Sequence, residues 1–165
     1  MDIRGNLDTR LKKLHDGAYD AIILACAGLR RLGLQSRISS VLEHTQMLPA
    51  PGQGALAIET RIADSRIQQL TDALNHRTTA LAVSAERGFL QRMGGGCNVP
   101  VAVYARIDQN KIKIDGLVAS PDGRSIVRDS ILVDVEKWND AVETISERIL
   151  SRGGREILKA VYGEL

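Results

Sequence analysis

The sequence is poor in cysteine and in aromatic residues. Its two cysteines, Cys26 and Cys97, lie far apart in the 165-residue chain, and their spacing matches neither a disulfide framework nor the paired ligands of a zinc site. We therefore expect no metal and a reducing, cytoplasmic environment. Aromatic residues make up 3% of the chain, whereas proteins that bind single-stranded nucleic acids combine a basic groove with stacking aromatic side chains. We expect no nucleic-acid partner.

The chain also has no long apolar run. The longest run, from Ala21 to Leu29, is well short of the roughly 20 residues that cross a bilayer. The start, Met1 to Arg4, carries charge where a signal peptide would be apolar. With 44% hydrophobic and 25% charged residues, the composition is that of a globular protein. These observations predict a soluble, cytoplasmic protein without a membrane partner.

The first part of the chain, up to about residue 47, predicts a piece of an α/β layer. Asn6 can cap a helix whose leucines recur at helical spacing, and Gly17 can end that helix. Residues 21–25 are continuously apolar, which is typical of a strand buried on both faces of a parallel sheet. A second helix is expected at about residues 27–34.

The middle part begins with a segment rich in proline and glycine, residues 49–54, which favours a hinge or crossover. A short strand is expected at residues 55–59. Ser65 and Gln68 have the spacing of a capping box and predict the start of a helix. One strand and one helix cannot enclose a core. We therefore expect this part to pack on a partner that the first part does not offer.

The last part predicts a small domain with its own core. A helix is expected at residues 78–93. Two segments with alternating apolar residues follow, at residues 101–107 and 112–118, and a third strand is expected at residues 125–133, with turns between the strands. A final helical stripe starts at Trp138 and is interrupted by Gly153 and Gly154. The pattern predicts an α+β domain in which helices cover a three-stranded antiparallel sheet.

Arginines near helix and strand ends form a candidate anion site. Arg4 precedes a predicted helix N-terminus and Arg10 lies about two turns further on, where unpaired N–H groups and the helix dipole favour negative charge. Arg30 and Arg31 follow the predicted buried strand, near the edge where open α/β sheets bind ligands. The planar guanidinium suits paired contacts with carboxylates. The alternative is that these are solvated surface arginines, and the residues alone leave both open.

Cys97 lies between a run of three glycines, residues 94–96, and Pro100. The glycines remove side chains that would shield the sulfur, so a large group could approach the thiol. The alternative is a glycine-rich helix end with an incidental cysteine. Cys26 lies in an apolar run and is interpreted as a packed small hydrophobe. The three histidines have no partner at metal or triad spacing and are interpreted as surface residues.

Several short motifs follow one another along the chain. They are Arg4-Gly5-Asn6, Thr9-Arg10, residues 19–25 running into 27–33, residues 48–54, Ala85-Glu86-Arg87 and residues 95–100. Together these segments resemble the porphobilinogen deaminase family, also called the hydroxymethylbilane synthases. The resemblance covers essentially the whole chain. Each motif alone is weak, whereas their common order is specific.

The resemblance implies a transferase of tetrapyrrole and heme biosynthesis. Such an enzyme joins four porphobilinogen units head to tail with release of ammonia, and its partners are porphobilinogen and linear oligopyrroles. Cys97 matches the family cysteine that carries a covalent dipyrromethane cofactor through a thioether bond. Arg4, Arg10 and Arg31 match arginines that hold the acetate and propionate groups of the cofactor and the growing chain. Gln53 falls in the hinge segment that borders this cleft.

In length the chain departs from the family, because it resembles the C-terminal half only. The resemblance implies that residues 1–47 are the C-terminal part of a periplasmic-binding-protein-like α/β second domain. Residues 48–76 would be a hinge with a strand and helix of the first domain, and residues 77–165 the C-terminal α+β domain that carries the cofactor.

No residue of the chain matches the family's catalytic aspartate, so no catalytic residue is assigned here. We therefore expect that this chain alone is inactive and either needs the missing N-terminal half or associates with itself. The alternative is a non-catalytic anion-binding module or an inactive fragment.

Overall fold

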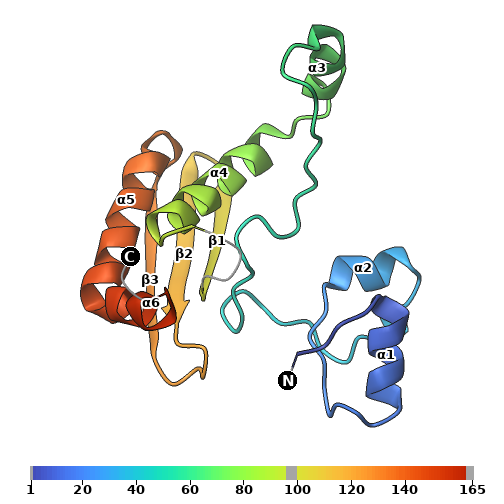
Figure 1. The fold of residues 1–165 in the computed structure, drawn as a ribbon. Coiled ribbons are helices and arrows are strands. Elements are labelled where there is room, and N and C mark those ends of the chain that lie inside the picture. The colour runs from blue at the N-terminus through green and yellow to red at the C-terminus, as the bar shows by residue number, and fades with distance from the viewer. Residues whose placement is uncertain (1, 96–99, 163–165) are drawn as a thin grey trace. The chain divides into compact units, whose positions relative to one another are not determined.

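The computed structural model describes residues 2–95 and 100–162. Within it the chain divides into two compact units, Met1–Glu43 and His44–Leu165. Figure 1 shows the elements of each unit in order along the chain. None of the helices in the described part is long and apolar enough to cross a membrane.

The first unit consists of short helices joined by loops. Helix α1 (Leu7–His15) is followed by α2 (Cys26–Arg31) and by η1 (Gln35–Arg37), a single 3₁₀ turn. As the sequence predicts, Asn6 caps α1, since its side-chain oxygen accepts a 2.9 Å hydrogen bond from the Thr9 amide. Leu11 and Leu29 are the buried apolar residues on these helices.

Two predicted strands are wrong. Residues 21–25 and 55–59 have no regular secondary structure and pair with no strand in the described chain, and Ile23 and Leu56 are 64% and 94% exposed. A strand exists only through the hydrogen bonds of a neighbouring strand, and a parallel strand must also be covered on both faces. The apolar composition of these segments is real, but the described residues contain no strand to pair with them.

Helix α3 (Ser65–Asp72) starts differently from the prediction. The cap is Asp64, whose carboxylate accepts from the Ile67 amide at 3.2 Å. The expected capping box between Ser65 and Gln68 is therefore wrong, because the helix begins one residue too early for Ser65 to precede it. Gln68 instead donates a 2.7 Å side-chain hydrogen bond to the carbonyl of Ile62.

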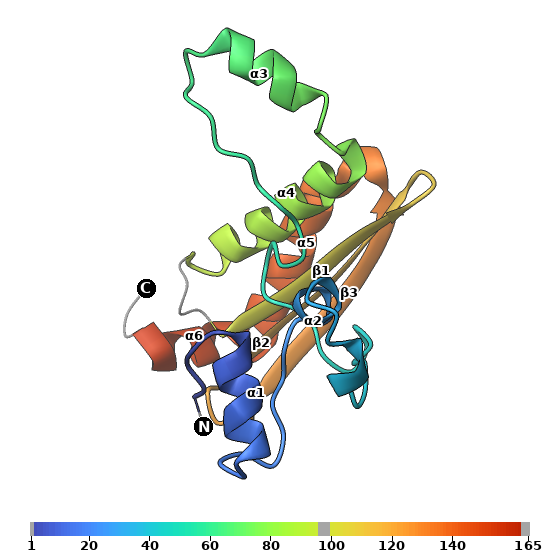
Figure 2. The same cartoon turned by 90° about the vertical axis from the view of Figure 1, so that its right-hand side faces the viewer.

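The predicted α+β domain is confirmed. Strands β1 (Val101–Asp108), β2 (Lys111–Ala119) and β3 (Ile126–Asp134) form an antiparallel sheet in the order β1-β2-β3. Helices α4 (Arg77–Arg92), α5 (Trp138–Ile149) and α6 (Arg155–Tyr162) cover one face of this sheet, as Figures 1 and 2 show. A 3₁₀ turn, η2 (Val135–Lys137), joins β3 to α5.

The core lies between the helices and the inner face of the sheet. Phe89 on α4 packs directly over Gly116 of β2, where an added Cβ would lie 2.8 Å from the ring. The helical stripe is interrupted where the sequence predicts, at η3 (Leu150–Gly154), because Gly153 has a φ of 108°. The fully buried apolar side chains are Phe89, Met93, Val103, Ile112, Ile114, Val118, Val142, Ile145, Ile149 and Leu158.

Candidate functional site

Arg10 contacts the loop before α1, next to Arg4. The guanidinium Nε of Arg10 donates a 2.8 Å hydrogen bond to the carbonyl of Gly5, the residue after Arg4. Lys13 Nζ lies 3.2 Å from the carbonyl of Arg4 and donates to it. The loop is therefore folded back on the first turns of α1 by cationic side chains of that helix. The Arg4 side chain itself is exposed.

Gly5 is required at its position for two reasons. Its φ of 122° lies in the region that side chains rarely adopt, and an added Cβ would lie 2.8 Å from Thr9 Cγ2. Thr9 is itself fixed, because its hydroxyl donates a 2.6 Å hydrogen bond to Asn6. The motif Arg4-Gly5-Asn6 with Thr9-Arg10 is thus one local structure in which each residue type has a physical reason.

Arg31 is the last residue of α2 and is exposed. Within the described residues no hydrogen bond joins it to Arg4 or Arg10. None of these three arginines has a carboxylate within salt-bridge distance in the part of the chain that the structure describes. Among the described residues, no carboxylate offsets the charge of these guanidinium groups, and guanidinium groups suit paired contacts with carboxylates.

Cys97 lies outside the described residues, but the glycines before it are explained in part. Gly94 and Gly95 have φ angles of 100° and 64°. Their amides donate to the carbonyls of Gln91 and Leu90, respectively, which is the hydrogen-bond pattern of a Schellman helix end. Two of the three glycines therefore end α4, as expected if the glycine run is a helix end.

Gln53 lies in a tight turn of the second unit. Its amide donates a 3.2 Å hydrogen bond to the carbonyl of Ala50, and its side chain is exposed. Gly52 and Gly54 on either side have φ angles of 73° and 85°, so the turn depends on both glycines. The turn presents the Gln53 side chain to solvent.

Sequence reasoning missed the buried carboxylate of Glu86, which is 5% exposed. One oxygen accepts a 2.9 Å hydrogen bond from the Ala105 amide, and the other accepts a 2.7 Å hydrogen bond from the Gly52 amide. Burial raises the pKa of this carboxyl above its usual value, while the two amides and the charge of His44 oppose the rise. The sequence did contain one sign of this burial, because Glu86 lies between Ala85 and Phe89, which belong to the apolar stripe of the helix.

The structure also changes the interpretation of His44. It is exposed, as expected, but its ring stacks on Tyr104 of β1 with the centroids 3.7 Å apart and the planes 18° apart. The guanidinium of Arg128 donates to the carbonyls of His44 and Thr45 at 3.5 and 3.1 Å. No group of three or more metal-ligating side chains occurs in the described part of the chain.

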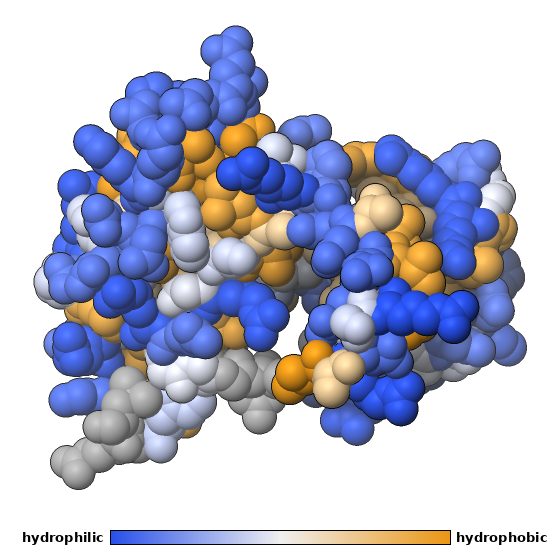
Figure 3. Space-filling view, turned by 90° about the horizontal axis from the view of Figure 1, so that it is seen from above, coloured by the Kyte–Doolittle hydropathy of each residue, from blue (hydrophilic) through white to orange (hydrophobic). Residues whose placement is uncertain are grey.

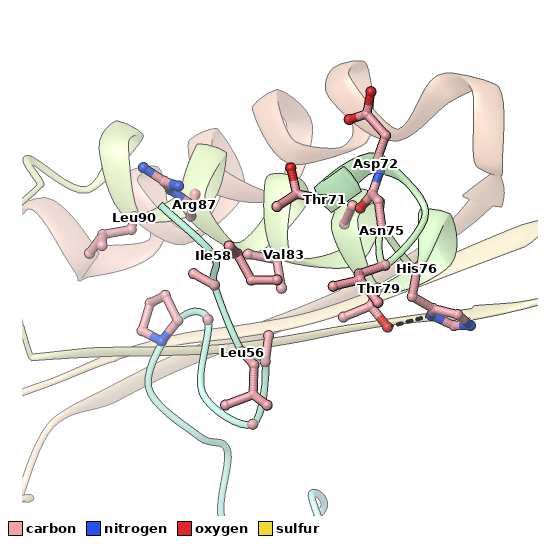
Figure 4. Close-up of a pocket in the computed structure, with 17 residues that line it drawn as sticks. Leu56, Ile58, Thr71, Asp72, Asn75, His76, Thr79, Val83, Arg87 and Leu90 are labelled. Carbon is pink, nitrogen blue, oxygen red and sulfur yellow. Dashed lines mark hydrogen bonds between the residues drawn. The ribbon is translucent and has the colours of Figure 1, made fainter. Parts of the chain in front are cut away.

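An apolar groove of about 800 Å³ lies beside the 51–54 turn. Figure 4 shows Ile58, Val83 and Leu90 lining it, with Arg87 near Leu90. At the other end His76 Nδ1 lies 2.7 Å from the hydroxyl of Thr79. Gln53, the predicted site residue that the structure describes in this unit, does not line the groove, although Gly52 and Gly54 beside it do.

Comparisons with known proteins identify the family. Residues 1–69 match a family model described as "Porphobilinogen deaminase, dipyromethane cofactor binding domain", and residues 80–151 match "Porphobilinogen deaminase, C-terminal domain". A curated porphobilinogen deaminase of Pelobacter propionicus is 46% identical over 162 residues, which are 98% of this chain and 52% of that protein. The chain thus spans about half the length of this relative. On these matches, the chain belongs to the porphobilinogen deaminase family.

Proposed function

We propose that this chain carries the primer-attachment part of a hydroxymethylbilane synthase. A dipyrromethane cofactor would be bound to Cys97 through a thioether and would supply the primer on which porphobilinogen units are added. The observation that carries this proposal is the match of both family models in order along the chain, including the one described as the cofactor-binding domain. The full reaction in this family would release ammonia and a linear hydroxymethylbilane.

Arg4, Arg10 and Arg31 would hold the acetate and propionate groups of the cofactor and of the growing chain. Every pyrrole ring carries two carboxylates, so charge accumulates as the chain grows, and charge-assisted contacts with guanidinium groups offset it. The absence of carboxylate partners for these arginines among the described residues supports this role. Gln53 would border the same cleft from the 51–54 turn.

The domain arrangement is part of the proposal. Residues 1–47 would belong to a periplasmic-binding-protein-like α/β domain, residues 48–76 would link to and complete another domain, and residues 77–165 would be the cofactor-carrying domain. The catalytic aspartate of the family has no counterpart in this sequence, so this chain alone would form no hydroxymethylbilane. Its partner would be an N-terminal half, or a second copy that covers the same apolar surface, in the cytoplasm.

Intact mass spectrometry tests the attachment. The chain would be exposed to porphobilinogen alone and together with the N-terminal half of the Pelobacter propionicus relative. The expected increment is two porphobilinogen units less two ammonia molecules, lost in Cys97→Ser and retained in the matched control Cys26→Ser. An unmodified chain in both preparations, or an increment that follows Cys26, would overturn the proposal and leave an anion-binding module as the better description.

A further inference from the structure

Glu86 is a carboxylate on the buried side of α4, and among the described residues it forms no ion pair, although the charge of His44 is near enough to lower its pKa. It lies on α4 between Ala82 and Phe89, which pack in or against the hydrophobic core. A buried, unpaired carboxylate is costly unless hydrogen bonds satisfy its oxygens. Both oxygens of Glu86 are satisfied by backbone amides, those of Ala105 and Gly52.

These two amides come from different parts of the second unit. Ala105 belongs to β1, the edge strand of the sheet, and its amide points away from β2. Two residues earlier on the same edge, the Val103 amide donates a 3.1 Å hydrogen bond to the carbonyl of Pro49. Glu86 therefore provides the next acceptor along the edge and, with its second oxygen, binds the turn that follows Pro49.

The segment before this turn is fixed to the same domain. We call residues 44–52 the strap. The His44 ring stacks on Tyr104 and the guanidinium of Arg128 binds the carbonyls of His44 and Thr45. Leu48 is 6% exposed, so the strap also contributes to the buried apolar surface. Gly52 is the last fixed residue of the strap, and Gln53 comes directly after it.

We propose that Glu86 is a positioning residue, whose carboxylate fixes the 51–54 turn on the edge of β1 and thereby sets the location of Gln53. The importance of Gln53 rests on the proposed function above, whereas the contact itself rests on the geometry alone. The carboxylate is the side chain that fits, because it offers one acceptor oxygen to each of the two amides. An apolar side chain would pack at this position but would leave two amides unpaired.

Glutamine separates this role from simple packing. It has nearly the shape of glutamate, yet it offers one acceptor oxygen and a donor group. Glu86→Gln can therefore satisfy either Ala105 or Gly52, but not both. Glu86→Ala satisfies neither, and it also removes packing atoms.

Amide hydrogen exchange of the full chain, followed residue by residue by NMR, tests the proposal. We expect exchange of the Gly52 amide to be at least about tenfold faster in Glu86→Ala, since hydrogen bonds to charged groups are the stronger ones. In Glu86→Gln one of the two amides should lose protection and the other keep it. The signals of Gln53 should shift in both variants. The matched control is Glu147→Gln, an exposed glutamate on α5.

Exchange at the Ile114 amide in the middle of β2 separates local from global effects. Ile114 is fully buried, and its protection should be unchanged in Glu86→Gln. Unchanged exchange at Gly52 and Ala105 in Glu86→Gln, or a rise there that Ile114 matches, would overturn the proposal. The assay requires no pyrrole, so failure to load Cys97 and failure of this contact are distinguishable results.

Discussion

Arg10 donates a 2.8 Å hydrogen bond through Nε to the carbonyl of Gly5, one residue after Arg4. One arginine of the proposed carboxylate site thus fixes the backbone beside the other. Because this bond uses Nε, the two terminal nitrogens of the guanidinium stay available for a ligand. Arg10 therefore makes a structural contact beside its proposed binding role, and substitution can separate the two.

Arg10→Lys should weaken binding of a synthetic dipyrromethane that carries acetate and propionate groups. Lysine keeps the charge but cannot hold the Gly5 carbonyl and a bidentate carboxylate together. With hydrogen bonds to charged groups worth about 1.5–3 kcal/mol, we expect a loss of about tenfold or more in affinity, measured by calorimetry. The control is Arg66→Lys on α3, an exposed arginine outside the proposed site. Equal weakening by both variants would contradict a specific site.

Gly5→Ala should disorder the start of α1. The substitution combines a φ of 122° with a Cβ placed 2.8 Å from Thr9 Cγ2, so the loop must move to accept it. The expected result is loss of the Thr9 and Arg10 NMR signals of the folded loop. Gly28→Ala is the matched control, because Gly28 lies in α2 with no atom within 4 Å of the added Cβ. That variant should gain about 0.5–1 kcal/mol of helix stability. Unchanged Thr9 and Arg10 signals in Gly5→Ala would contradict the close contact between residue 5 and Thr9.

Gly116→Ala should destabilise the C-terminal domain by about 1–3 kcal/mol, the range for overpacked cores. The added methyl would meet the Phe89 ring at 2.8 Å and Ile149 at 3.5 Å. Urea unfolding of the full chain measures the change. Adding Phe89→Leu should make the pair less costly than the sum of the two single variants, because the shorter side chain vacates the contact. Additive costs would mean that the ring and the strand do not meet in this way.

The strands of the chain show what the sequence could predict and what it could not. The alternation in β1, β2 and β3 was sufficient because the three strands pair with one another, so the local pattern and the final sheet agree. The pattern at residues 21–25 and 55–59 was equally apolar and failed, since strand formation depends on a neighbour that the described residues do not supply. The hydrogen bonds of Glu86 connect residues 34 and 19 positions away, and no local pattern encodes such contacts. From the sequence, only the position of Glu86 within an apolar helical stripe indicates that its side chain is buried.

The pH dependence of stability should change when Glu86 is replaced. Burial raises the pKa of its carboxyl from 4.5, so the folded chain holds this proton more tightly than the unfolded chain does. The resulting contribution to stability is fully present below about pH 4.5 and is lost as the pH rises through the folded pKa. Wild type should therefore lose stability relative to Glu86→Gln across that window. Urea unfolding at several pH values measures both, with Glu147→Gln as the control, and parallel curves for wild type and Glu86→Gln would rule out this origin.

Exposed apolar side chains between residues 55 and 75 should make the chain self-associate. Leu56, Ile62 and Leu74 are 94%, 93% and 69% exposed, and Figure 3 shows apolar atoms reaching the surface between polar side chains. Exposed apolar surface favours association. Leu56→Asp with Ile62→Asp should shift the chain toward monomer in sedimentation velocity, whereas Leu132→Asp on β3, where leucine is 63% exposed, should not. If wild type stays monomeric at high concentration, the exposed segments do not self-associate, and covering them would require a different partner.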